Sequence, residues 1–133
     1  MAAQQNAFKQ ALKKGEMQIG CWMSFAEPAA AEMMGTAGFD WLVIDGEHAP
    51  NDIRSIRDQL LALEASNSHA VVRVPVGETW LIKMVLDAGA QTILVPIVES
   101  AAQAQELVRA CRYPPAGVRG VGAMASRATM YGS

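Results

Sequence analysis

Four short stretches of nearly continuous apolar residues recur along the chain. They are rich in β-branched and aromatic side chains, and they span Ile19–Phe25, Trp41–Ile44, Ala70–Val74 and Thr92–Val98. Short, uninterrupted apolar runs are typical of strands that are buried on both faces, as they are in parallel sheets. The pattern therefore predicts four parallel strands.

The stretches between these strands carry apolar residues at helical spacing. We expect helices over Pro28–Ala37, Asn51–Ala65, Thr79–Ala88 and Ala101–Arg112. Signals at their ends agree, because Pro28 suits a first helical turn and Asn51 or Asp52 can cap the second helix. Gly38 and Gly89 follow helices, where a left-handed residue commonly ends them. The expected order is βαβαβαβα, with about 22 to 28 residues from strand to strand, enough for one crossover helix each.

This order fits two α/β folds. Parallel strands joined by right-handed crossovers form either an open doubly wound sheet or an eight-stranded barrel, and the pattern alone does not choose between them. A complete TIM (β/α)8 barrel needs about 250 residues, so four βα units in 133 residues would be the N-terminal half of one. Residues 1–133 would then form a single domain with two strand edges, which a C-terminal half or another chain covers, or which stay open.

Composition and charge narrow the possible functions. The chain is 51% apolar and 18% charged, which is typical of a soluble globular domain. Its 11 basic and 13 acidic residues give a net charge of -2, so we expect neither nucleic acid nor a membrane as a partner. The apolar runs are shorter than the roughly 20 residues that cross a bilayer, and the N-terminal residues lack the apolar run of a signal peptide. Cys21 and Cys111 fit no disulfide framework or Cys-x-x-Cys motif, which favours reduced thiols in the cytoplasm.

Polar residues with catalytic chemistry follow the predicted strands, where parallel α/β folds gather their ligands. The second strand runs into the segment Asp45–His48, and the third delivers Arg73. His48 suits proton transfer near neutral pH, although a loop histidine that caps the next helix explains it equally well. His69 precedes the third strand, at the opposite rim, and we assign it to structure.

Arg73 and Asp87 each need a partner of opposite charge. Arg73 lies within an apolar strand, where an unpaired guanidinium costs several kcal/mol. A structural carboxylate, Asp45 or Glu47, could satisfy it, and so could a substrate carboxylate or an enolate oxygen. Asp87 lies near the end of the third helix, where the helix dipole disfavours a carboxylate. A His48–Asp87 pair would compensate this charge, orient the imidazole and raise its basicity.

A segment rich in Gly and Pro lies near the end of the sequence. Residues Arg112–Gly122 contain glycines spaced G-x-x-G-x-G, which differs from the dinucleotide-binding fingerprint. We interpret the segment as a long loop, with Arg119 and Arg127 as contacts for an acidic substrate. A small flavodoxin-like domain that binds phosphate through Gly117–Gly122 is an alternative.

Several longer motifs together resemble one enzyme family. They are Asp-Gly-Glu-His-Ala-Pro-Asn at residues 45–51, Leu-Asp-Ala-Gly-Ala-Gln at residues 86–91 and Arg-Tyr-Pro-Pro-Ala-Gly-Val-Arg-Gly at residues 112–120. The chain resembles the HpcH/HpaI aldolases, which include 4-hydroxy-2-oxoheptanedioate and 2-dehydro-3-deoxyglucarate aldolases, from about Phe8 to the last residue. The resemblance implies a TIM-barrel, class II enzyme that reversibly cleaves a 4-hydroxy-2-oxo acid into pyruvate and an aldehyde. It also implies a divalent metal (Mg, Mn or Co) and no Schiff-base lysine.

The resemblance further implies roles for five residues. Arg73 would bind the pyruvyl oxygen that gains negative charge, and His48, oriented by Asp87, would be the acid and base of the reaction. Trp22 would help to form the wall of the substrate pocket, and Glu47 would support the site without touching the substrate.

The sequence thus looks like the N-terminal half of a longer enzyme. The family's metal ligands come from later strands, so we expect none before Ser133. The resemblance implies a homo-oligomer, a hexamer in the complete enzyme, and we expect the isolated 133 residues to bind divalent metal weakly and to lack aldolase activity. An inactive half-barrel that associates with a second copy is the other alternative. The residues identify neither the aldehyde nor the metal.

Overall fold

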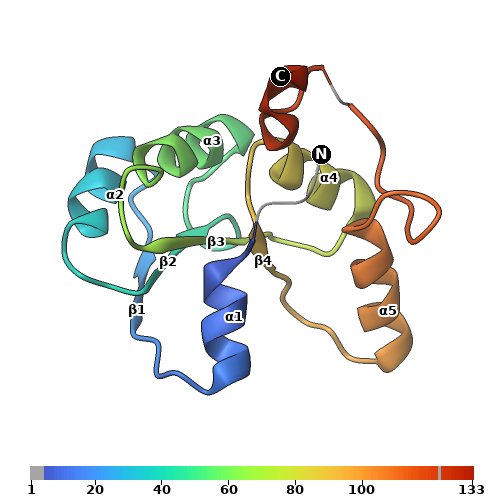
Figure 1. The fold of residues 1–133 in the computed structure, drawn as a ribbon, viewed down its shortest axis with the longest axis horizontal. Coiled ribbons are helices and arrows are strands. Elements are labelled where there is room, and N and C mark those ends of the chain that lie inside the picture. Colours follow the sequence, from blue (N-terminus) through green and yellow to red (C-terminus); the bar gives the residue numbers. More distant parts are fainter. Residues whose placement is uncertain (1–4, 123) are drawn as a thin grey trace.

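The computed structural model describes residues 5–122 and 124–133 of the chain. Strands and helices alternate along it, and one further helix precedes the first strand (Figure 1). In order, the elements are α1 (Ala7–Lys14), β1 (Gly20–Met23), α2 (Pro28–Gly35), β2 (Trp41–Asp45), α3 (Ile53–Ala62), β3 (His69–Arg73), α4 (Thr79–Asp87), β4 (Thr92–Leu94), α5 (Ala101–Ala110) and a 3-10 helix, η1 (Arg127–Gly132). The predicted strands and helices are therefore confirmed, although most have shorter bounds.

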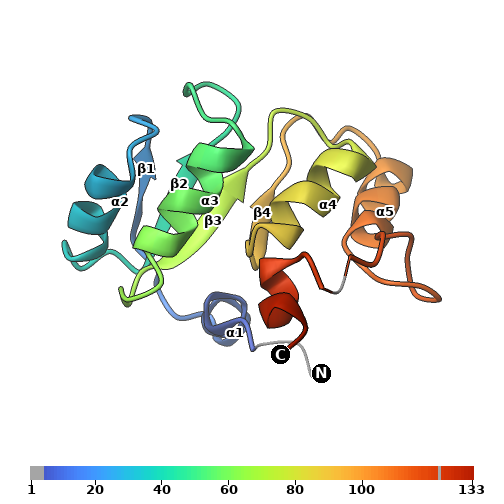
Figure 2. The same ribbon diagram turned by 90° about the horizontal axis from the view of Figure 1, so that it is seen from above.

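The strands form one parallel sheet in the order β1-β2-β3-β4. Helices α2, α3 and α4 lie along one face of this sheet (Figures 1 and 2). A doubly wound sheet reverses its strand order at a switch point and carries crossover helices on both faces, whereas a barrel adds each new strand to the same edge. The order of the described strands contains no reversal, so it is the order of part of a barrel.

The hydrophobic core lies between the sheet and its helices. β2 is the most deeply buried strand, because Leu42, Val43 and Ile44 are each at most 1% exposed. Successive side chains of a strand point to opposite faces, so both faces of β2 are covered, as its continuous apolar pattern predicts. Ile56 and Leu60 of α3 belong to the same core cluster as Leu42 and Ile44.

The ends of the helices follow the expected signals. Pro28 is the first residue of α2, and Asp52 caps α3 by accepting hydrogen bonds from the backbone at the start of the helix. Gly38 and Gly89 have φ angles of 88° and 112°, the left-handed region that favours glycine. No helix in residues 5–122 or 124–133 is long and apolar enough to cross a membrane.

Strand β4 is shorter than the apolar run that predicts it. It ends at Leu94, whereas the run continues to Val98. Pro96 has no N–H to donate to a neighbouring strand, and Ile97 has a φ of 53°, outside the range of regular strands. In the described sheet β4 is also an edge strand, so one neighbour alone supplies its hydrogen bonds.

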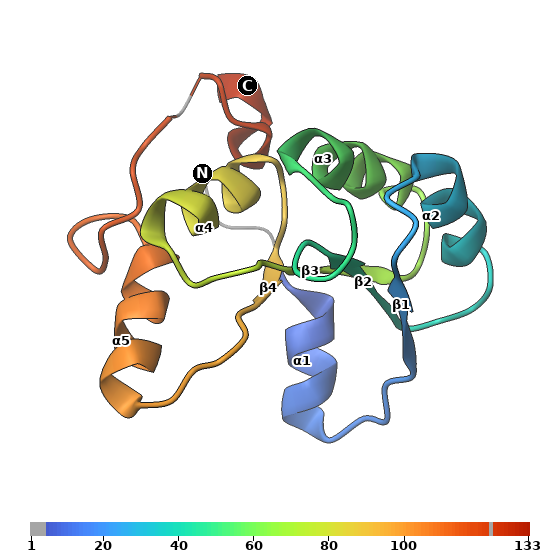
Figure 3. The ribbon, with the colours of Figure 1, turned by 180° about the vertical axis from the view of Figure 1, so that it is seen from behind.

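Helix α1 has no counterpart among the predicted elements. It lies on the opposite side of the sheet from α2 and α3, near the starts of the strands (Figures 2 and 3). Asn6 caps it by accepting from Lys9 N–H and donates its side-chain amide to Thr92 Oγ1 at 2.8 Å. The ring of Phe8 stacks on that of His69 with centroids 5.3 Å apart, and burial lowers the pKa of His69. These contacts agree with a structural role for His69.

Candidate active site

The register of the sheet brings Asp45 and Arg73 together. They are direct neighbours at the carboxyl ends of β2 and β3, so their side chains project from the same face. The guanidinium of Arg73 donates from Nε to Asp45 Oδ1 at 2.9 Å and from Nη2 to Asp45 Oδ2 at 2.8 Å. Its Nη1 lies 2.7 Å from Glu47 Oε2. Both of the carboxylates considered as partners of Arg73 therefore hold it.

This cluster is strongly charged and largely buried. The side chains of Asp45 and Arg73 are 5% and 19% exposed. The hydrogen bonds from Arg73 lower the pKa of Asp45 to about 2 against the opposing effect of burial, and the backbone N–H groups of Glu47 and His48 lower it further. The hydrogen bond to Asp45 in turn raises the pKa of Arg73, with a smaller contribution from Glu47. The charges of Asp45 and Arg73 are therefore both retained at neutral pH.

Trp22 lies over the flat face of the same guanidinium. The Arg73 Cζ atom is 4.4 Å from the centroid of the indole, which is within the range of a cation–π contact. Trp22 follows Cys21 on β1 and is 45% exposed. Three neighbouring strands thus place Trp22, Asp45 and Arg73 in one cluster, while Glu47 reaches it from the loop after β2.

The loop after β2 folds back over the end of β3. The N–H of Gly46 donates to the carbonyl of Arg73 at 2.8 Å, and a Cβ atom on Gly46 would lie 2.7 Å from that oxygen. The side chain of Asp45 accepts from the N–H groups of Glu47 and His48 at 2.9 and 3.2 Å. His48 therefore lies at the rim of the cluster, with a side chain 74% exposed and Nε2 3.7 Å from Glu47 Oε1.

The structure does not pair Asp87 with His48, and this expectation is wrong for the described chain. Helix α4 runs back from the carboxyl end of the sheet, so its last residue lies at the end opposite to the loop after β2 (Figure 2). There Asp87 Oδ1 accepts from Arg119 Nη2 at 2.6 Å. Arg119, which also lies 4.6 Å from the ring of Tyr113, supplies the positive charge that the end of the helix requires.

The two arginines considered as substrate contacts have structural partners instead. Arg119 is 8% exposed and binds Asp87, and Arg127 Nη2 lies 2.6 Å from Glu64 Oε2. Part of the Gly-rich loop is already hydrogen-bonded to the chain that precedes it. The backbone N–H groups of residues 117, 118 and 119 donate to carbonyls of residues 113, 109 and 112, so these three donors are used by the loop and the last turn of α5.

Two amide side chains at this site are not among the predicted functional residues. Asn51 and Gln59 join the loop after β2 to the buried face of α3. A signal was present in the sequence, because Gln59 interrupts the apolar stripe that includes Ile56 and Leu60, and a polar residue in such a stripe needs a buried partner.

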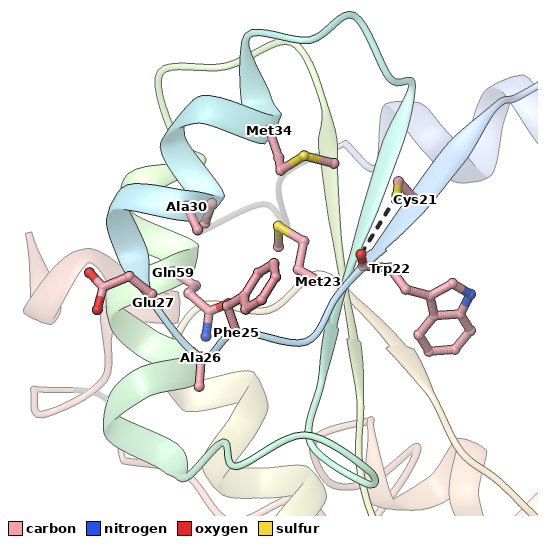
Figure 4. A pocket seen from close by; sticks show the side chains of 10 residues that line it. Cys21, Trp22, Met23, Phe25, Ala26, Glu27, Ala30, Met34 and Gln59 are labelled. Atoms are coloured by element: carbon pink, nitrogen blue, oxygen red, sulfur yellow. Dashed lines mark hydrogen bonds between the residues drawn. The ribbon is translucent and has the colours of Figure 1, made fainter.

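A cavity of about 250 Å³ lies beside β1, apart from the charged cluster. It is bordered by mainly apolar side chains of β1, α2 and the segment between them, including Met23, Phe25 and Met34 (Figure 4). Trp22 also borders it, but its indole points to the other side of the strand. The cavity therefore faces the helices, while Arg73 lies on the face of the sheet that carries the indole.

The side chains that the structure describes do not make a metal site by themselves. Residues 5–122 and 124–133 contain no group of three or more His, Cys, Asp or Glu side chains placed to hold a metal ion. The two carboxylates of the charged cluster, Asp45 and Glu47, both bind Arg73. The donor set of this cluster suits a guanidinium rather than a divalent cation.

The chain matches the model of a known family. The model of the HpcH/HpaI aldolase/citrate lyase family matches residues 18–130, and the chain belongs to this family. A solved structure of a HpcH/HpaI aldolase/citrate lyase family protein from Burkholderia cenocepacia superposes with a TM-score of 0.91 and is 44% identical, covering 96% of this chain and 52% of that one. The predicted TIM-barrel fold and the predicted family are therefore confirmed.

Two relatives have names that describe an activity. A hydroxypyruvate/pyruvate aldolase from Roseobacter denitrificans is 66% identical over 132 residues, which are 99% of this chain and 52% of that protein. A 4-hydroxy-2-oxovalerate aldolase from Rhodococcus jostii is 55% identical over 124 residues, which are 92% of this chain and 48% of that protein. The chain thus spans about half the length of the curated relatives it matches.

Proposed function

We propose that this chain supplies part of the active site of a class II pyruvate aldolase. The reaction is the reversible cleavage of a 4-hydroxy-2-oxo acid into pyruvate and an aldehyde. The observation that carries the proposal is the guanidinium of Arg73, fixed at the carboxyl end of β3 in a chain of the HpcH/HpaI family. The names of the Roseobacter and Rhodococcus relatives, which describe aldolases, support the same chemistry.

Arg73 has donors to spare for a substrate oxyanion. A guanidinium carries five N–H groups, and the described contacts with Asp45 and Glu47 use three of them. The remaining donors bind the oxygen of the 2-oxo acid that gains negative charge as the carbon–carbon bond breaks. Because Asp45, Glu47 and Trp22 already hold the guanidinium, little reorganisation is needed when this charge develops.

His48 is the proposed proton carrier. In the cleavage direction, the imidazole takes the proton of the 4-hydroxyl group as the bond between C3 and C4 breaks, which releases the aldehyde and leaves the pyruvate enolate. The protonated imidazole then returns this proton to C3 of the enolate, which gives pyruvate and restores the neutral base. The carboxylate of Glu47 lies 3.7 Å from Nε2 of the imidazole and supports the site without touching the substrate, and Trp22 forms a wall of the substrate pocket.

The complete enzyme is proposed to use a divalent metal, Mg, Mn or Co, bound by residues outside this chain. When bound, the metal would supply Lewis-acid stabilisation of the negative charge that develops on the 2-oxo acid. The donor set around Arg73 does not fit a cation, because Asp45 and Glu47 both bind the guanidinium. A cytoplasmic homo-oligomer, hexameric in the complete enzyme, is part of the same proposal.

The test compares two arginine substitutions in the full-length protein. Arg73→Ala removes the oxyanion donor, and Arg57→Ala removes a guanidinium that is 49% exposed and bound to Asp58. Each variant is assayed for cleavage of 4-hydroxy-2-oxo acids, with the released pyruvate measured by a coupled dehydrogenase. We expect kcat to fall about 100- to 1000-fold for Arg73→Ala and to stay unchanged for Arg57→Ala. An Arg73→Ala variant with wild-type kcat contradicts the proposal.

A further inference from the structure

The loop that carries Glu47 and His48 is anchored to the sheet at both ends. At its start, the N–H of Gly46 donates to the carbonyl of Arg73. At its far end, the side chain of Asn51 donates from Nδ2 to the carbonyl of Asp45 at 2.8 Å. Asn51 thus closes the loop onto the residue whose carboxylate holds Arg73.

The orientation of Asn51 is fixed by a second amide. Its Oδ1 accepts from Gln59 Nε2 at 2.6 Å and from Ser55 Oγ at 2.8 Å. Gln59 Nε2 also donates to the carbonyl of Ser55 at 3.0 Å. Because the carbonyls of Asp45 and Ser55 can only accept, Asn51 must turn its nitrogen toward Asp45, and Gln59 must turn its nitrogen toward Asn51.

Gln59 occupies a position at which packing alone favours an apolar side chain. It is 1% exposed, and Ile56 and Leu60 beside it on α3 are 5% exposed. It also borders the apolar cavity next to β1 (Figure 4). A buried primary amide is tolerated when its hydrogen bonds are made, and the bonds of this amide lead to Asn51 and to the first turn of α3.

We propose that Asn51 and Gln59 are positioning residues of the aldolase reaction, which act through Asp45. The inference rests on the function proposed above. Gln59 orients Asn51, Asn51 holds the main chain of Asp45, and Asp45 then presents its carboxylate to Arg73 and to the N–H groups of Glu47 and His48. This series of contacts, the Gln59–Asn51–Asp45 relay, sets the distance between two groups. They are the guanidinium of Arg73, which binds the oxyanion, and the imidazole of His48, which carries the proton.

The test uses two variants that break the relay and one matched control, all in the full-length protein. Asn51→Asp keeps the shape of the side chain but turns an acceptor toward the Asp45 carbonyl, and Gln59→Met keeps the volume but removes the amide. Asp52→Ala removes the cap of the same helix and so lowers its stability, and it leaves the contacts of Asn51 with Asp45 and Gln59 in place.

Three quantities are measured for each variant: kcat and KM, the melting temperature, and the backbone amide signal of His48. Selective ¹⁵N-histidine labelling gives this signal, which is assigned by its loss in a His48→Gln variant. We expect Asn51→Asp and Gln59→Met to lower kcat about 10- to 100-fold, to change KM less, and to move the His48 amide signal. Asp52→Ala lowers the melting temperature alone.

The outcomes separate the inference from the proposed function. If both relay variants lose no more kcat than Asp52→Ala at a similar loss of melting temperature, or if the His48 signal stays in place, Asn51 and Gln59 are merely structural and the inference is overturned. If the wild-type protein shows no aldol cleavage but the His48 signal moves in both relay variants, the proposed function fails and the positioning of the loop by Asn51 and Gln59 is supported.

Discussion

The pairing of Asp45 with Arg73 predicts how much stability one carboxylate contributes. The guanidinium holds the pKa of Asp45 at about 2, against an ordinary value of 3.8. Since a pKa difference of one between the folded and unfolded states corresponds to about 1.4 kcal/mol, Asp45 contributes about 2 kcal/mol to the free energy of unfolding at pH 7. Asp45→Asn removes this charge and keeps the shape of the side chain.

The direction of the pKa shift defines the pH range over which the Asp45 carboxylate stabilises the fold. The folded state has the lower pKa, so the stabilisation is complete well above pH 3.8 and is lost as the pH falls toward 2. The difference in unfolding free energy between wild type and Asp45→Asn should therefore be largest at neutral pH. It should fall to about half of that value at pH 3.

Urea unfolding followed by tryptophan fluorescence measures this difference. The control is Asp58→Asn, because Asp58 also binds an arginine, Arg57, but both side chains are more than 40% exposed. We expect about 2 kcal/mol of destabilisation for Asp45→Asn at pH 7 and less than about 0.5 kcal/mol for Asp58→Asn. A destabilisation by Asp45→Asn that stays constant from pH 7 to pH 3 would refute the assignment of this stability to the Asp45 charge.

Two further substitutions test the geometry around the site. Gly46→Ala places a Cβ atom 2.7 Å from the carbonyl oxygen of Arg73, so we expect it to destabilise the protein by about 1 to 3 kcal/mol; an equally stable variant in the same urea titration speaks against this close approach. Asp87→Asn removes the partner of the buried Arg119, so we expect a lower melting temperature and an unchanged pH profile of kcat. A shifted profile would show that Asp87 reaches His48 in the assembled enzyme.

The alternation of strands and helices could be predicted because it depends on local pattern. A strand that is buried on both faces has a continuous apolar run, as in Leu42–Ile44. A residue that caps a helix contacts backbone groups within one turn, so its effect is also local. The limits of an edge strand do not follow from such a pattern. Residues 95–98 are as apolar as β4, yet Ile97 departs from strand geometry. Helix α1 was missed although Phe8, Ala11 and Leu12 recur at helical spacing. Contacts distant in sequence, such as that of Phe8 with His69, hold it in place.

The candidate site was predictable where strand neighbours decide it. Arg73 within an apolar strand required a carboxylate, and the register of β2 with β3 supplies Asp45 directly opposite. The expected His48–Asp87 pair was wrong for the described chain because the sequence does not show that helix α4 carries its last residue away from the loop after β2. Arg119, 32 residues further on, neutralises Asp87 instead.

The choice between the two α/β folds required the strand order, which the sequence pattern leaves open. After each crossover helix here, the next strand is added at the same growing edge of the sheet. β1 and β4 are therefore the outer strands of the described sheet. Ligands of a doubly wound sheet bind where the strand order reverses, and this sheet has no such point among its described strands. In a barrel the ends of neighbouring strands converge on one mouth. The meeting of Trp22, Asp45 and Arg73 from three consecutive strands is therefore a consequence of the strand order itself, and it is this convergence that makes the carboxyl end of the sheet the place to look for chemistry.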